Sequence, residues 1–221
     1  CQLDKIYMSN LASYNRVIMQ RNKLLKELEI HGDYLDTLQI WDMQMARYGA
    51  EIIRGRRRFI DELREIIIPI HAAITGGREN IDISYEPSVE ADELEQTLAR
   101  NRARDLKARV SLTGPHRDDL AFCVDGMDIR TFGSQGQQRT AALSLKLSEI
   151  ELVRRRTGDA PILLLDDVLS ELDSGRQNKL LDSIDGVQTL LTCTGVDEFV
   201  TDRFPINKIF RVTCGNIVSE N

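Results

Sequence analysis

The distribution of apolar positions predicts two long helices at the start of the chain. Apolar residues recur at three- and four-residue spacing over residues 3–28 and again over residues 34–74, which is the pattern of amphipathic helices. Between these segments, Gly32 is suited to end the first helix and Asp33 to cap the second. We therefore predict a helical hairpin, and we expect Pro69 to kink or end its second helix.

One face of the second predicted helix carries large apolar side chains. These are Trp41, Met45, Tyr48, Ile52 and Phe59. Their helical spacing places them near one stripe, so packing against the first helix is favoured over the binding of a cofactor.

The pattern changes after two adjacent glycines, Gly76 and Gly77. Residues 81–85 alternate between apolar and polar as a strand does, and residues 90–107 have the pattern of a helix with both charge signs on its surface. Short strands joined by turns follow. They include a predicted hairpin at residues 124–127, where an Asp-Gly pair marks the turn.

The last third of the chain alternates between helices and strands. The predicted elements are a helix at 137–155, a buried strand at 162–165, a helix at 176–184, a second buried strand at 189–192 and a last strand at 209–212. This order is typical of a parallel α/β sheet. We predict an α/β fold with two domains, a helical arm at residues 1–78 and the second half of an α/β sheet at residues 79–221.

Composition limits the class of protein without selecting one. The chain has 221 residues, of which 42% are hydrophobic and 29% charged, and a net charge of -6. It has no run of about 18 apolar residues and no basic-then-apolar leader, so we expect a cytoplasmic protein. The negative charge argues against a surface coated in positive charge, but it allows local basic patches.

The cysteines are few and far apart. There are 4 cysteines, none in a C-x-x-C pair, and only 3 histidines. This pattern favours reduced thiols over a disulfide framework or a zinc site.

An apolar strand at residues 162–165 ends in two carboxylates, Asp166 and Asp167. Nucleotide hydrolases use such a pair at the edge of a sheet to hold Mg²⁺ and to polarise the attacking water. The complementary phosphate-binding motif, G-x-x-x-x-G-K-[ST], does not occur in the sequence. Because the chain also begins at Cys1 rather than at a methionine, we interpret it as part of a longer protein.

A second segment with candidate chemistry precedes the predicted helix at 137–155. Residues 132–140 place glycines, a serine and amide side chains at its start. Free N–H groups and the helix dipole there favour an anion such as the γ-phosphate of a nucleotide, although a capped helix after a loop is the alternative. The order of this segment, the paired aspartates and the sequence Ser-Glu-Leu-Asp at 170–173 makes the combination specific.

Residues 114–120, 133–147 and 162–173 together closely resemble the RecF family, bacterial recombinational-repair proteins of the SMC-like branch of ABC-type ATPases. Segments of the predicted arm, at residues 14–16, 20–26 and 48–53, are similar to the same family. The resemblance covers nearly the whole chain, and the missing part corresponds to the family's N-terminal portion with its phosphate-binding loop. It implies an ABC-type ATPase head with an α-helical hairpin arm, and ATP and Mg²⁺ as cofactors.

The resemblance also implies a task and partners. The intact protein would be a slow ATPase that dimerises on ATP, binds duplex DNA near single-strand gaps and helps RecO and RecR to load a recombinase. The alternatives are an SMC-like head fragment, for which the arm is too short, and a non-enzymatic scaffold with a decayed nucleotide site. The joint presence of the two motifs argues against decay. Without the phosphate-binding loop, we predict that this chain alone hydrolyses no ATP.

The resemblance assigns site residues by position. The ABC signature, which contacts the γ-phosphate of ATP held by the partner subunit, would comprise Ser134, Gln135, Gly136 and Gln137. Asp166 matches the Mg²⁺-associated Walker B aspartate, and Asp167 stands where most ABC ATPases have the water-polarising glutamate, one methylene longer. Ser170 and Asp173 belong to the D-loop at the dimer interface. Thr194 stands in place of the switch histidine, a departure that weakens the case for a γ-phosphate sensor.

A run of arginines lies in the second predicted helix. It comprises Arg54, Arg56, Arg57 and Arg58, and is joined by Arg64. Guanidinium groups around a helix are suited to bind DNA phosphates. A solvated face fits the run equally well, because helix spacing allows pairing with Glu51, Asp61, Glu62 and Glu65. Both interpretations stay open.

The sequence His-Arg-Asp at residues 116–118 has the composition of a catalytic cluster. A turn led by Pro115, in which Arg117 pairs with a neighbouring carboxylate, is the favoured interpretation. A position of Arg117 near nucleotide or DNA is a secondary hypothesis.

Overall fold

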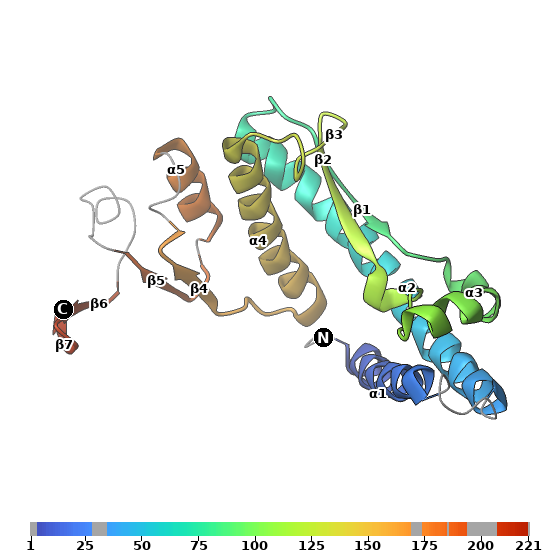
Figure 1. The fold of residues 1–221 in the computed structure, drawn as a ribbon. Helices are drawn as coiled ribbons and strands as arrows, with labels where there is room; N and C mark the ends of the chain where they lie inside the picture. The colour runs from blue at the N-terminus through green and yellow to red at the C-terminus, as the bar shows by residue number, and fades with distance from the viewer. Residues whose placement is uncertain (1–3, 28–34, 169–173, 185, 194–206, 221) are drawn as a thin grey trace. The chain divides into compact units, whose positions relative to one another are not determined.

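The computed structural model describes residues 4–27, 35–168, 174–184, 186–193 and 207–220. The chain forms two compact units, Cys1–Asp159 and Ala160–Asn221 (Figure 1). The boundary predicted near residue 78 does not coincide with this division, because the strand that follows residue 78 packs on the long helix that precedes it. The assignment of residues 1–78 to an arm domain therefore stays a proposal.

The predicted helical hairpin is present in the first unit: α1 spans Lys5–Glu27 and α2 spans Leu35–Thr75. The buried side chains where α1, α2 and the later helix α3 meet include Tyr14, Val17, Met45, Ile52 and Leu94. Trp41 and Tyr48 are partly buried in the same cluster, so packing against the first helix is confirmed for this part of the predicted stripe. Phe59 packs instead in a separate core with Ile60 and Ile81. The break predicted at Gly32 and Asp33 lies outside the described residues.

The helix α2 continues through Pro69 to Thr75, so the prediction that it could end at Pro69 is wrong. Proline removes one backbone N–H and crowds the preceding turn of a helix. Ile67 and Ile74, on either side of Pro69, are nevertheless buried. Tertiary packing of the apolar face therefore outweighs the local penalty.

A small antiparallel sheet packs along α2. Its strands are β1 (Ile81–Glu86), β2 (Asp119–Val124) and β3 (Met127–Asp128), in the order β1-β2-β3. Asp125 and Gly126 join β2 to β3 with φ of 51° and 80°, the positive values that a two-residue hairpin turn requires. This confirms both the strand and the hairpin predicted here. The shared core includes Ile60, Leu63, Ile67, Ile81, Ile83 and Val124.

The charged helix predicted at residues 90–107 is confirmed. A short 3-10 helix, η1 (Ala91–Glu93), leads into α3 (Leu94–Ala108). Leu94 and Leu98 are fully buried against α1 and α2. A second 3-10 helix, η2 (Pro115–Arg117), precedes β2.

The helix predicted at residues 137–155 is α4, which spans Gln135–Thr157 and lies beside α2 (Figure 1). Ser144 on the buried side of α4 lies 2.9 Å, Oγ to Nδ1, from the buried His71 of α2. Ala141 of α4 is also buried in a core to which α2 contributes, so the first half of α4, which begins with the candidate signature, packs against the long helix.

The second unit contains the paired aspartates. The strands β4 (Leu163–Asp166) and β5 (Thr189–Thr192) form a parallel pair, and α5 (Ser174–Ser183) lies between them in the sequence. The strands β6 (Ile209–Thr213) and β7 (Asn216–Glu220) form an antiparallel hairpin. The predicted helix and strands are confirmed, whereas β7 was not predicted.

The prediction that β4 and β5 are buried strands is correct for only one face. Leu165 is 6% exposed, but Leu164 is 72% and Leu190 is 55% exposed. Alternate side chains of a strand point to opposite faces of the sheet. Within the described part of the chain, the face that carries Leu164 and Leu190 is open.

Candidate functional site

The candidate signature forms a reciprocal cap at the start of α4. Ser134 has extended φ and ψ, and its Oγ accepts a hydrogen bond of 3.2 Å from the backbone N–H of Gln137. In return, Oε1 of Gln137 accepts a bond of 3.0 Å from the backbone N–H of Ser134. This is a capping box, so the sequence alternative of a capped helix describes the local geometry.

The same geometry leaves hydrogen-bond donors at the helix start. The hydroxyl hydrogen of Ser134 is not used when its Oγ accepts the cap bond. The backbone N–H groups of Gln135 and Gly136 have no hydrogen-bond partner among the described residues. Three donors at the positive end of a 23-residue helix can bind an anion. The cap is therefore compatible with a γ-phosphate contact.

Gly133 sets the entry of the chain into α4. A Cβ atom at this position would lie 2.5 Å from the backbone oxygen of Ile129. That oxygen accepts bonds from Gly133 N at 3.1 Å and from Gln138 Nε2 at 2.9 Å. The loop is closed so tightly on Ile129 that only glycine fits without a shift.

The paired aspartates lie where β4 ends. In the parallel register, Asp166 is opposite Thr192, the last residue of β5. The hydroxyl of Thr192 donates a hydrogen bond of 2.5 Å to Oδ1 of Asp166 and accepts one of 3.1 Å from the backbone N–H of Asp167. Sequence reasoning missed Thr192, although its place at the end of the neighbouring parallel strand was a signal.

Asp167 has the left-handed backbone φ of 50°. This conformation costs a non-glycine residue about 1–3 kcal/mol, and such residues gather at functional sites. Its backbone N–H also donates a bond of 3.1 Å to the carbonyl oxygen of Thr192. Two bonds from one N–H thus hold the left-handed turn directly after Asp166.

The donor set at the end of β4 fits magnesium chemistry. Mg²⁺ is usually bound by one or two carboxylates together with waters and substrate phosphates. Asp166 is exposed and offers a carboxylate of this kind. The described ranges contain no cluster of three or more acidic, histidine or cysteine side chains that would hold a metal ion unaided.

Three predicted site residues, Ser170, Asp173 and Thr194, lie outside the described residues. Of the rest, the structure gathers the signature at the start of α4 in the first unit, and Asp166 with Asp167 at the end of β4 in the second. The geometry of the signature and that of the paired aspartates are therefore described separately.

The arginines of α2 are largely engaged within the protein. Arg54 contacts Glu51 and Asp92, and Arg57 contacts Glu90, in pairs of 2.5–2.8 Å. These pairs favour the solvated-face interpretation, although Asp92 and Glu90 lie outside the helix and were not among the predicted partners. Two further members of the run differ in their contacts. Arg56 donates hydrogen bonds to the oxygens of Pro115 and Tyr7. Arg58 is exposed, and within the described ranges its side chain makes no ion pair or hydrogen bond.

The His-Arg-Asp segment is a proline-led turn, as predicted, but its ion pair is different. Asp118 accepts hydrogen bonds from the Tyr85 hydroxyl and, at 2.8 Å, from the backbone N–H of Ser88. Its cationic neighbour is Arg56 at 3.4 Å, whereas Arg117 reaches the carbonyl oxygen of Ser111. The prediction that Arg117 pairs with a neighbouring carboxylate is therefore wrong, because α2 supplies the cation instead.

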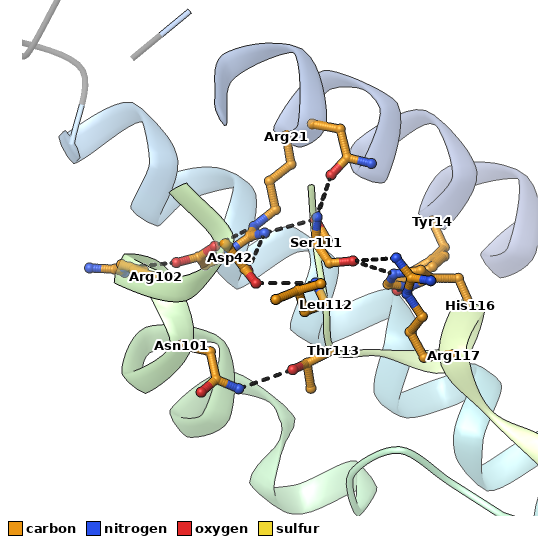
Figure 2. A network of polar contacts seen from close by, with 12 residues as sticks. Tyr14, Arg21, Asp42, Asn101, Arg102, Ser111, Leu112, Thr113, His116 and Arg117 are labelled. Atoms are coloured by element: carbon orange, nitrogen blue, oxygen red, sulfur yellow. Dashed lines mark hydrogen bonds and ion pairs between the residues drawn. The ribbon is translucent and has the colours of Figure 1, made fainter. Parts of the chain in front are cut away.

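A buried polar network, which sequence reasoning missed, joins the helices of the first unit (Figure 2). Arg21 of α1 is fully buried and forms ion pairs of 2.7 Å with Asp42 of α2 and Asp105 of α3. It also donates a bond of 2.7 Å to Ser111 Oγ, and Arg102 pairs with Asp42 at 2.6 Å. The network fixes α1, α2 and α3 relative to one another.

The network continues through a histidine. His116 Nε2 lies 2.9 Å from the carbonyl oxygen of Ser111, and Nδ1 lies 2.7 Å from the hydroxyl of Tyr14. The carbonyl can only accept, so Nε2 carries the proton and Nδ1 accepts from Tyr14. Burial raises the pKa of Tyr14 and lowers the pKa of His116, which keeps both groups neutral.

The fold and these motifs define the class of protein: part of the head of an ABC-type ATPase, with helices packed as an arm. No protein-family model matches the chain. The DNA replication and repair protein RecF of Agathobacter rectalis is 56% identical, over 98% of this chain and 60% of that protein. The protein of the same name from Lachnospira eligens is 55% identical, over 100% of this chain and 61% of its own length.

Solved structures agree with this class. A structure of the recombination mediator protein RecF-ATP in the RecFOR pathway matches with a TM-score of 0.88 at 34% identity, over 99% of this chain and 60% of that chain. Over the part that it spans, the chain belongs to the RecF family. It covers about 60% of the length of these relatives. Within the described ranges, no helix is long and apolar enough to cross a membrane.

Proposed function

We propose that the chain supplies the signature and Walker B half of a composite ATP site in a cytoplasmic DNA-repair ATPase. The observation that carries the proposal is the start of α4, where the Ser134 hydroxyl and two backbone N–H groups are available to an anion. Its membership of the RecF family supports ATP as that ligand. The signature of one subunit would contact the γ-phosphate held by another, so ATP would join two heads.

The second unit would supply a different part of the nucleotide chemistry. Asp166 would hold Mg²⁺ through a carboxylate that the Thr192 hydroxyl orients. Asp167 would accept a proton from, or orient, the attacking water. Bound Mg²⁺ would neutralise charge on the transferring phosphate. Ser170, Asp173 and Thr194 stay proposed contacts to nucleotide at the dimer interface.

The wider task also stays a proposal. It is the binding of DNA at single-strand gaps and the loading of a recombinase with RecO and RecR. The solved relative is described as a mediator in the RecFOR pathway, which supports these partners. DNA contact by the α2 arginines is also a proposal. The ion pairs of Arg54 and Arg57 argue against a DNA contact by these two side chains. Arg58 is exposed and stays a candidate for such a contact.

The signature is tested by a charge at Ser134 in the full-length polypeptide. Ser134→Asp keeps a good helix cap but places a carboxylate where the γ-phosphate would lie. We expect it to lose ATP-dependent dimerisation in sedimentation with ATP and Mg²⁺. Ser134→Asn, which caps as well without a charge, is the matched control and should retain more dimer. A Ser134→Asp protein that dimerises like the wild type would overturn the proposal.

The chain alone is proposed to hydrolyse no ATP, because its sequence has no G-x-x-x-x-G-K-[ST] motif. The measurement is steady-state phosphate release by the purified chain. Turnover that is abolished by Asp166→Asn or Asp167→Asn would show that the chain is an ATPase by itself and that this expectation is wrong.

A further inference from the structure

The charges of α3 are separated by sign along the helix. The acidic residues Asp92, Glu93 and Glu95 lie at its start, whereas the segment from residue 100 to residue 109 holds five basic residues and one acidic residue. That acidic residue, Asp105, is fully buried and paired with Arg21. The exposed charge of the second half of α3 is therefore positive, although the chain as a whole is acidic.

Three of the basic residues share one outward face. Arg100, Arg104 and Lys107 follow the spacing i, i+4, i+7, which places them on one side of a helix. Leu98 and Asp105, which are buried, lie on the opposite side. Each of the three cations is exposed. From the first to the last they span about 10 Å along the helix axis.

These cations differ from most arginines of the first unit in their partners. Arg100 contacts the hydroxyl of Thr97. For Arg104 and Lys107, no ion pair or hydrogen bond of the side chain is found within the described ranges. By contrast, Arg130 is paired with Asp119 and Arg155 with Glu151, at 2.8 Å each. The positive charge of the α3 face is thus not neutralised by the protein itself.

The helix dipole explains the position of only one of these three cations. Cations stabilise the last turn of a helix, but the effect falls off within that turn. Lys107 lies in the last turn of α3, whereas Arg100 and Arg104 lie further from it. The helix carrying the row is also held firmly, because Asp105 and Arg102 bind it to the buried network of Arg21 and Asp42 (Figure 2).

We propose that Arg100, Arg104 and Lys107 of α3 bind the phosphate backbone of duplex DNA. This rests on the DNA-binding role proposed above and moves its main contact from α2 to α3. The span of about 10 Å equals about three base-pair steps along the duplex axis, at a rise of about 3.4 Å each. Surfaces for single strands add aromatic side chains that stack on bases. The sequence of α3 has no aromatic residue, so the row is suited to phosphates rather than to bases.

The test is the salt dependence of duplex binding by the full-length polypeptide. Binding of a fluorescent duplex is followed by anisotropy between about 50 and 200 mM salt, and each phosphate contact contributes about -0.9 to the slope of log K against log salt. The double variant Arg104→Gln/Lys107→Gln should reduce the magnitude of the slope by about 2. The reduction should be the same for two duplexes of unrelated sequence, because phosphate contacts do not read the bases. The control Arg130→Gln/Arg155→Gln removes the same charge from paired positions outside α2 and should leave the slope unchanged.

The outcomes separate this inference from the function on which it rests. Wild-type protein that binds no duplex would remove the DNA-binding proposal itself. Wild-type binding with an unchanged slope in the α3 variant would overturn the assignment to α3 alone. An equal loss of slope in the control would also overturn it, because the effect would then be one of net charge. Both double variants change exposed side chains, and unchanged circular dichroism and thermal midpoints confirm that they fold.

Discussion

Replacement of Arg21 by methionine should strongly destabilise the first unit. Methionine keeps an unbranched apolar side chain but removes the guanidinium that pairs with Asp42 and Asp105 at 2.7 Å each. Asp42 keeps its pair with Arg102 at 2.6 Å. Asp105 is fully buried and would be left with the backbone N–H of Leu112 at 3.1 Å. The variant thus leaves one buried carboxylate without a cation.

The expected loss follows from this uncompensated charge. Removal of one partner of a buried ion pair costs about 3–5 kcal/mol, because the remaining charge stays out of water. For a chain of this size each kcal/mol shifts the thermal midpoint by about 2–4 °C, so the shift should be about 6–20 °C. Asp105→Asn in the same background removes the stranded charge and should restore part of the stability.

Urea unfolding followed by circular dichroism measures the loss. The matched control is Arg54→Met, because Arg54 also contacts two carboxylates, Glu51 and Asp92, but at the surface. Exposed pairs contribute about 1 kcal/mol or less. If Arg21→Met costs no more than Arg54→Met, or if Asp105→Asn brings no recovery, the buried network does not stabilise the fold in the way described.

Two further predictions concern pH and the entry to α4. Burial lowers the pKa of His71 and of His116 below the ordinary 6.5, so the folded chain binds fewer protons than the unfolded chain in this range. The free energy of unfolding should therefore fall as the pH decreases through 6.5. Urea unfolding at pH values on either side of 6.5 measures this change. A free energy of unfolding that stays constant or rises as the pH decreases would contradict the prediction. Gly133→Ala should cost about 1–3 kcal/mol, since overpacking forces the backbone to move. Its Cβ would meet Ile129 O at 2.5 Å, and an unchanged urea midpoint would disprove that contact.

Most elements of the chain could be predicted from local patterns. The two long helices, the Asp-Gly hairpin and the helix after the signature each have a periodicity or a turn pair that neighbouring residues determine. Pro69 shows the limit of such reasoning, because burial of Ile67 and Ile74 carries α2 past it. The second strand of the last hairpin, β7, was missed.

The candidate site divides in the same way. Capping by Ser134 and Gln137 is local in sequence, so the pattern indicated it before the structure did. Contacts between residues far apart in the sequence could not be predicted from local patterns. The bond from Thr192 to Asp166 depends on the register of two parallel strands, and the pairing of Asp118 with Arg56 depends on how η2 meets α2.

The sequence by itself determined the class of this protein: motifs in a set order, and helices and strands with clear periodicity. Only the tertiary structure decided which charges are neutralised. Ion pairs join residues far apart in the chain, such as Arg21 with Asp105. Composition shows mixed signs along α3, but burial of Asp105 leaves an exposed positive face, because a carboxylate paired inside the protein no longer offsets cations at the surface.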